Sequence, residues 1–161
     1  MMRGLQEFRG GIHRQRGAAA IEFALIFIPM FALFYALASY GLIMALVQGM
    51  TLAAEEGARA AVAVDRTAFA SDADYTAGVV PVVRTQVGRS LAWLPDTLKA
   101  RVLGENNALV DVQLGSDSVL AVTVRYPNYA AAPLVPVLSL PGIGSVPRVG
   151  EHLEARANIR L

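Results

Sequence analysis

The chain has 161 residues, of which 55% are hydrophobic and 17% charged, and its formal net charge is +1. That length leaves room for one ordinary domain and excludes two of normal size. The charged share is below the roughly 25% of water-soluble domains, so the composition indicates one membrane anchor with a small soluble module. Because the sequence contains no cysteine, disulfides and thiolate metal sites are excluded as well.

The N-terminal residues 1–16 are basic. They carry four arginines against a single acid, Glu7, and the charged residues beyond the following apolar stretch begin with Glu55 and Glu56. By the positive-inside tendency, this asymmetry predicts that the N-terminus faces the cytoplasm. The four arginines are Arg3, Arg9, Arg14 and Arg16.

A long apolar stretch follows. The segment Phe23–Ala54 contains no Asp, Glu, Lys or Arg, whereas about 20 apolar residues are enough to span a bilayer. A removable secretory signal has an apolar core of roughly 7–15 residues, so a retained anchor fits better. We predict one helix over residues 18–64, about 70 Å long at about 1.5 Å per residue, whose outer part projects beyond the membrane.

Small residues recur at every fourth position of this helix. Such a ridge would let another helix approach closely. An alanine-rich helix can also produce the pattern by chance, but glycine destabilises a helix unless packing compensates, which favours helix packing. The members of this small-residue ridge are Gly41, Ala45, Gly49, Ala53, Gly57 and Ala61.

A short motif opens the apolar helix. Gly17 follows the basic residues, four small or apolar residues come next, and then Glu22 and Phe23. This arrangement resembles the processing site of type IV pilins and pseudopilins, and the Glu-Phe pair with the later Ala53–Val62 resembles TadE-like minor pilins of the tight-adherence system. The resemblance implies that residues 1–17 are a leader, removed by a prepilin peptidase after Gly17, and that Ala18 becomes the new N-terminus.

The acid in this motif has a physical rationale. An ionised carboxylate at the mouth of a membrane helix costs a few kcal/mol unless it is paired or reaches the interface. Cleavage would expose an ammonium group on Ala18, with which Glu22 of a neighbouring subunit could pair. The alternative is that Glu22 is an interfacial acid stabilised by the helix dipole, with Gly17 merely flexible.

Residues 65–161 are expected to form a small extracytoplasmic α+β module. A second helix is predicted over Asp72–Leu94, with a break or a late start at Pro81. Trp93 is expected in the core. The apolar stripe that would pack this helix on a sheet comprises Val82, Val83, Val87, Leu91 and Leu94.

Alternating residues on either side of a polar turn at 115–118 predict a β-hairpin over Ala108–Tyr129. Its second strand would direct Leu120, Val122, Val124 and Tyr126 to the core. A closing strand within Val149–Leu161 would complete a three-stranded sheet. Tyr126-Pro127 also resembles the YP motif of TadE-like sequences. The apolar stretch Pro133–Pro147 is expected to be a long loop that touches lipid, another subunit or its own sheet.

No pattern indicates catalysis, a metal or a cofactor. The two histidines, His13 and His152, lie far apart, and the pair Asp72 and Asp74 lacks a following ligand pattern. The arginines of the outer part are interleaved with acids, which argues against nucleic-acid binding.

These observations predict an α+β protein with a long N-terminal pilin-like transmembrane helix and a small module with a short antiparallel sheet. The expected function is that of a minor pilin (pseudopilin) in tight-adherence pilus assembly, in the bacterial inner membrane and, once assembled, outside the cell. The implied partners are a prepilin peptidase, other pilins and minor pilins, the assembly platform and membrane lipid. One alternative stays open, an unprocessed single-pass scaffold or sensor with an outer binding module. A membrane-tethered hydrolase would need catalytic residues that this chain does not group together.

Overall fold

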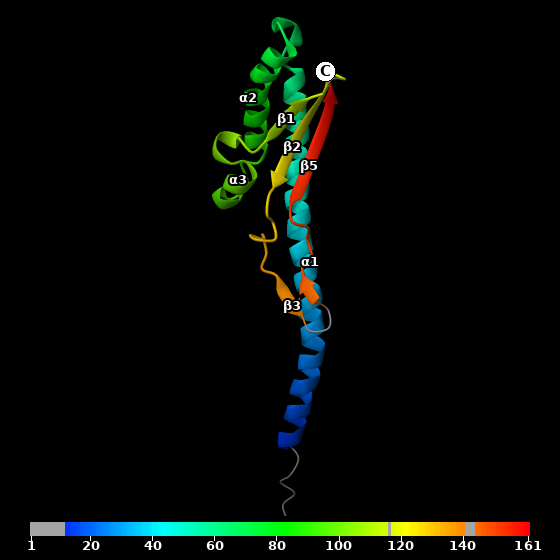
Figure 1. Cartoon of the computed structure of the whole chain (residues 1–161). Helices are drawn as coiled ribbons and strands as arrows, with labels where there is room; N and C mark the ends of the chain where they lie inside the picture. Colours follow the sequence, from blue (N-terminus) through cyan, green and yellow to red (C-terminus); the bar gives the residue numbers. More distant parts are fainter. Residues whose placement is uncertain (1–11, 116, 141–143) are drawn as a thin grey trace, which may run out of the picture. The chain divides into compact units, whose positions relative to one another are not determined.

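The computed structural model describes residues 12–115, 117–140 and 144–161, with side chains from Gly17 onward (Figure 1). The chain divides into two compact units, one ending at Ala38 and one comprising Ser39–Leu161. Helix α1 contributes to both units. The elements are α1 (Ile12–Val62), the 3₁₀ turn η1 (Arg66–Ala68), α2 (Asp72–Ser90), α3 (Asp96–Val102), the 3₁₀ turn η2 (Glu105–Asn107), β1 (Asp111–Leu114), β2 (Val119–Tyr126), β3 (Leu138–Leu140), β4 (Gly144–Val146) and β5 (Leu153–Arg160).

The long N-terminal helix is present, with ends that differ from the predicted 18–64. It starts at Ile12, inside the basic segment, and ends at Val62. The end has a local cause: the Asp65 side chain accepts a hydrogen bond of 2.9 Å from the backbone N–H of Thr67. Asp65 thereby caps η1, which turns the chain away from the axis of α1.

A three-stranded antiparallel sheet forms the β part of the second unit. Its strand order is β1-β2-β5, so β2 is central. The register places Leu120 opposite both Leu114 of β1 and Ile159 of β5. The predicted hairpin and the predicted closing strand are both confirmed.

The core of the second unit lies between the sheet, α2 and the outer part of α1 (Figure 1). Alternation along β2 accounts for the contribution of the sheet, because successive side chains point to opposite faces. The four residues predicted to face the core are buried, namely Leu120, Val122, Val124 and Tyr126. From α1, the buried residues run from Ile43 to Ala61.

Helix α2 is continuous through Pro81, so the predicted break or late start there is wrong. Proline removes one backbone donor from the helix, but Tyr75 and Val79 before it and Val83 and Val87 after it are all buried. Packing on both sides therefore holds the helix together. The N-terminus of α2 is capped by Ser71, whose hydroxyl accepts a hydrogen bond from the backbone N–H of Asp74.

Two side chains predicted for the core are exposed instead. Val82 is 41% exposed and Trp93 is 60% exposed. α2 ends at Ser90 rather than Leu94, and the turn that follows places the indole of Trp93 against α1 at Gly49. Trp93 is therefore exposed because it follows the end of α2, although its side chain is apolar.

The stretch Pro133–Pro147 is not simply a loop. It contains β3 and β4, which pair antiparallel as a separate two-stranded sheet. Leu134 packs against the main core, which confirms contact with the chain's own module. Ile143, also expected among its apolar contacts, lies outside the described residues.

Candidate functional site

The apolar surface of α1 is the most unusual feature of the chain. Among the described residues, α1 is the one helix long and apolar enough to cross a membrane, over Gly17–Val62, and its most apolar window contributes nothing to the core. Large side chains such as Ile21, Leu25 and Phe34 are 66%, 69% and 69% exposed. Exposed apolar surface on this scale marks a membrane or protein contact.

The predicted processing site lies at the start of this surface. Gly17, Ala18, Glu22 and Phe23 are all exposed residues of α1, and the Gly17–Ala18 bond is inside the helix. A Cβ atom built on Gly17 would meet no atom within 4 Å. Glycine at this position costs about 1 kcal/mol of helix stability relative to alanine, and no side chain among the described residues gives a packing reason for it.

Glu22 lies on the same exposed surface. Among the residues whose side chains are described, none forms an ion pair with it. The side chains of Arg14 and Arg16 lie outside the described residues. An acid on an apolar helix calls for a partner or for an interface.

A row of aromatic rings runs along α1 from the predicted site. Phe23, Phe27, Phe31 and Tyr35 are spaced by four residues and stack in sequence, with ring centroids 5.4, 6.0 and 6.3 Å apart. Phe27 and Phe31 are 43% and 47% exposed. Of these four residues only Phe23 belongs to the predicted motif, although the i, i+4 spacing of the aromatic residues is visible in the sequence and could have revealed the row.

The structure divides the small-residue ridge into two parts. In the outer part, Ala53, Gly57 and Ala61 are buried inside the second unit. A Cβ atom on Gly57 would lie 2.7 Å from Val87 Cγ2 and 3.1 Å from Val83 Cγ1. Here glycine is needed because α2 approaches the backbone of α1 within the same chain.

The inner part of the ridge has no such partner. Gly41 and Ala45 are exposed, and a Cβ atom on Gly41 would meet nothing within 4 Å. Gly49 lies between the two parts, where its Cβ atom would be 2.7 Å from Cζ2 of Trp93. Only the inner part of the ridge is therefore open to a helix of another subunit.

Charged residues end the uncharged segment of α1. Arg59 pairs with Glu55 at 3.3 Å and with Glu56 at 3.1 Å, one turn apart on the helix. Glu56 also accepts a long hydrogen bond of 3.5 Å from the Gln86 side chain of α2. These groups are solvated and paired, as expected for a part of α1 outside the lipid.

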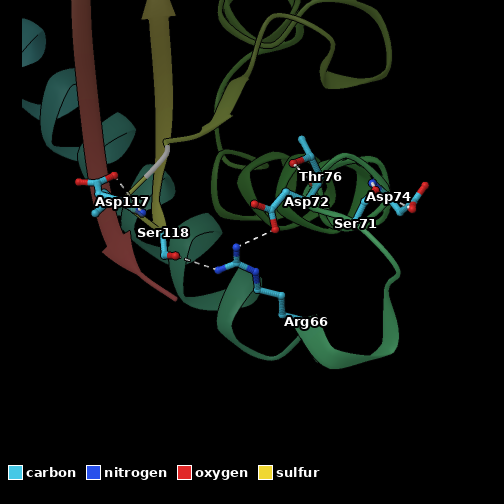
Figure 2. Close-up of polar contacts among 8 residues, drawn as sticks. Arg66, Ser71, Asp72, Asp74, Thr76, Asp117 and Ser118 are labelled. Atoms are coloured by element: carbon cyan, nitrogen blue, oxygen red, sulfur yellow. Dashed lines mark hydrogen bonds and ion pairs between the residues drawn. The ribbon is translucent and has the colours of Figure 1, made fainter.

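Polar contacts join the α1–α2 connection to the β1–β2 turn (Figure 2). Arg66 donates to Asp72 at 2.7 Å and to Ser118 at 3.1 Å. Asp74 accepts a hydrogen bond of 2.7 Å from the Ser71 hydroxyl. Both carboxylates of the Asp72 and Asp74 pair are thus engaged in holding the fold, and the described residues contain no group of three that could bind a metal ion.

An open groove of about 780 Å³ lies beside this cluster, between α2 and β1. Its walls are mainly apolar, from Ala73, Ala77, Val80 and Leu114. Its polar groups already have partners, because Asp72 binds Arg66 and the Thr76 hydroxyl donates to the backbone carbonyl of Asp72 at 2.7 Å. The groove lacks the convergent polar groups that orient a small ligand.

A comparison with protein families finds a match, which lies within α1. The family model described as TadE-like protein matches residues 17–59, which is less than a third of the chain. The match starts at Gly17 and includes Glu22, Phe23 and the ridge from Gly41 to Gly57. It confirms the predicted resemblance over this segment and relates the chain to pilus-associated proteins. No curated protein and no solved structure matches the chain.

Proposed function

We propose that this chain, with its TadE-like segment, is a minor pilin that is processed after Gly17 and takes part in assembly of a tight-adherence type IV pilus. One observation carries the proposal: the family match begins at Gly17 and covers the helix whose apolar surface the chain itself leaves exposed. A membrane holds this surface before assembly, and neighbouring subunits cover it afterwards.

The glycine at the cleavage position supports processing. Peptide groups inside α1 are hydrogen-bonded along the helix, so a peptidase needs the helix to open locally at the Gly17–Ala18 bond. Glycine lowers the cost of opening by about 1 kcal/mol and leaves the bond unshielded by a side chain. Because no neighbour among the described side chains requires glycine at this position, recognition by the peptidase is the better reason for it.

Cleavage gives Glu22 a role. The new ammonium group on Ala18 is the complement of a carboxylate that has no ion-pair partner among the described side chains. Pairing of Glu22 in one subunit with Ala18 of the next would remove the cost of an isolated charge in an apolar setting. The same pair would set the axial register between subunits.

The membrane orientation follows from charge. The basic N-terminal segment stays in the cytoplasm of a bacterial cell, and the module from Asp65 onward lies on the other side of the inner membrane. The partners are then a prepilin peptidase, the pilus assembly platform and other pilins or minor pilins. Helix packing uses the inner part of the ridge, Gly41 and Ala45, and the exposed aromatic row.

Complementation of a strain that lacks the gene tests the assembly role. A Glu22→Gln variant keeps the size of the side chain and removes the charge that pairs with Ala18. A Glu55→Gln variant is the matched control, because Glu55 is an exposed acid of the same helix paired within the chain to Arg59. We expect Glu55→Gln to restore surface pili seen by electron microscopy and Glu22→Gln to fail at equal membrane levels of protein.

Other outcomes would contradict the proposal. Normal piliation with Glu22→Gln would show that the charge sets no register. Normal piliation in the strain without the gene would remove the assembly role and would favour an unprocessed single-pass scaffold or sensor.

A further inference from the structure

The two longest uncharged stretches of the sequence meet in the folded chain. The first is Phe23–Ala54 in α1, and the second is Tyr126–Pro147, which contains the β3–β4 hairpin. The backbone N–H of Arg148, directly after the second stretch, donates a hydrogen bond of 3.0 Å to the Tyr40 hydroxyl of α1. The end of the hairpin is thus attached to α1 inside the apolar segment.

The apolar side chains of the hairpin are not part of the core. Leu134 before the hairpin and Val149 after it pack against the main core, whereas Leu138 and Leu140 are half-buried without belonging to it or packing against it. Val137 is 47% exposed. A two-stranded sheet is marginally stable alone in water, so an apolar hairpin that the core does not cover needs another contact.

The attachment point indicates what that contact is. Tyr40 is the eighteenth residue of the uncharged stretch that begins at Phe23, and about 20 residues cross the hydrocarbon core. Tyrosine is also one of the residues enriched at the membrane–water interface. Within about one turn of Tyr40 on α1, Leu42 and Met44 are 55% and 60% exposed, so the helix still carries exposed apolar surface at the level of the attachment.

We propose that the β3–β4 hairpin is a second membrane contact, lying in the outer lipid interface with Val137, Leu138 and Leu140 toward the acyl chains. This inference rests on the proposed function only in that α1 must span the membrane. The contact fixes the height and tilt of the outer module over the bilayer before the subunit is extracted. Lipid is favoured over a protein partner because the stretch lacks charged residues throughout and continues the exposed apolar surface of α1.

The absence of cysteine from the sequence allows a direct test with the full chain. Three single-cysteine variants are labelled with an environment-sensitive fluorophore and reconstituted in phosphatidylethanolamine–phosphatidylglycerol vesicles. Ser139→Cys reports on the hairpin, Leu33→Cys on the span and Asp117→Cys on the distant β1–β2 turn. All three positions are exposed, so the label does not disturb the core. Lipids with a quencher near the headgroup or near the end of the acyl chain locate each label.

The expected result is loss of fluorescence at Ser139→Cys with the shallow quencher, loss at Leu33→Cys with the deep quencher, and no loss at Asp117→Cys. Loss at Leu33→Cys without loss at Ser139→Cys would overturn the hairpin contact and leave the span intact. Absence of loss at Leu33→Cys would overturn the span and with it the proposed function. If the label at Ser139→Cys becomes less accessible to the quencher lipids as the protein-to-lipid ratio rises, a second copy of the chain covers the hairpin. That result would also overturn the inference.

Discussion

Addition of one methyl group at Gly57 should distinguish the two parts of the small-residue ridge. In Gly57→Ala the new Cβ would lie 2.7 Å from Val87 Cγ2 and 3.1 Å from Val83 Cγ1. Val83 and Val87 are fully buried, and their short side chains cannot swing away, so α1 and α2 must separate. Overpacking of this kind costs about 1–3 kcal/mol.

Gly41→Ala is the matched control, because it adds the same methyl group to the same helix where no atom lies within 4 Å. Both variants gain about 1 kcal/mol of helix propensity, so the difference between them isolates the packing term. We expect Gly57→Ala to be less stable than Gly41→Ala by about 1–3 kcal/mol. Gly41→Ala should be at least as stable as the wild type and should lose pilus assembly, since the position is open to another subunit.

Chemical denaturation of the full chain in a mild detergent, followed by the emission of Trp93, measures these free energies of unfolding. A Val87→Ala background removes the closer of the two tight contacts of the new methyl group and leaves that with Val83, so Gly57→Ala should cost clearly less there. Equal stability of Gly57→Ala and Gly41→Ala, or no rescue in the Val87→Ala background, would refute the assignment of the outer part of the ridge to packing within the chain.

Three further substitutions test the module, each by the same denaturation assay. Tyr75→Phe keeps the buried ring and removes the 3.1 Å hydrogen bond from its hydroxyl to the Ala61 carbonyl, which should cost about 1 kcal/mol; an unchanged midpoint would contradict this. Leu120→Ala empties a fully buried position of β2 and should cost about 2–5 kcal/mol, whereas a loss well below that would place the core elsewhere. Hydrogen bonds from the Thr67 hydroxyl and backbone N–H lower the pKa of Asp65 below its ordinary 3.8, so its contribution is present above pH 3.8 and is lost as pH falls through the lowered pKa. Asp65→Asn should therefore weaken the acid dependence of the unfolding midpoint, and an identical pH profile would count against the interaction.

Local patterns were enough to predict the sheet and the apolar helix. The side-chain alternation of β2 predicts which of its residues reach the core, and the uncharged length of α1 predicts a possible membrane span, because each feature depends on one element alone. Alternation likewise predicts a closing strand within Val149–Leu161, where β5 lies at Leu153–Arg160. These parts of the fold therefore agree with the sequence analysis.

Tertiary contacts decided the features that the sequence did not reveal. Pro81 sits in a continuous helix because buried residues on both sides hold it, and Trp93 is exposed because α2 ends before it. The hydrogen bond that attaches the chain after β4 to α1 joins Arg148 to Tyr40, 108 residues away. No local pattern contains such information.

In the candidate site, too, some features are visible in the sequence and others depend on tertiary contacts. The spacing of Gly17, Glu22 and Phe23 is visible in the sequence, and so is the ridge. Which ridge glycines serve the chain's own fold depends on where α2 packs, and the structure assigns Gly57 to that contact and leaves Gly41 open. A repeat of small residues indicates close packing but does not identify the packing partner.

The central claim is that the chain is a prepilin cut after Gly17, and its N-terminus in the native membrane tests it most directly. Intact mass and N-terminal sequence should be measured for the wild type, for Gly17→Val and for Ala20→Val, which places the same side chain on the exposed surface three residues away. We predict a chain that starts at Ala18 in the wild type and in Ala20→Val, and an uncut chain in Gly17→Val. A wild-type chain that keeps residues 1–17 in cells with assembled pili would contradict the account.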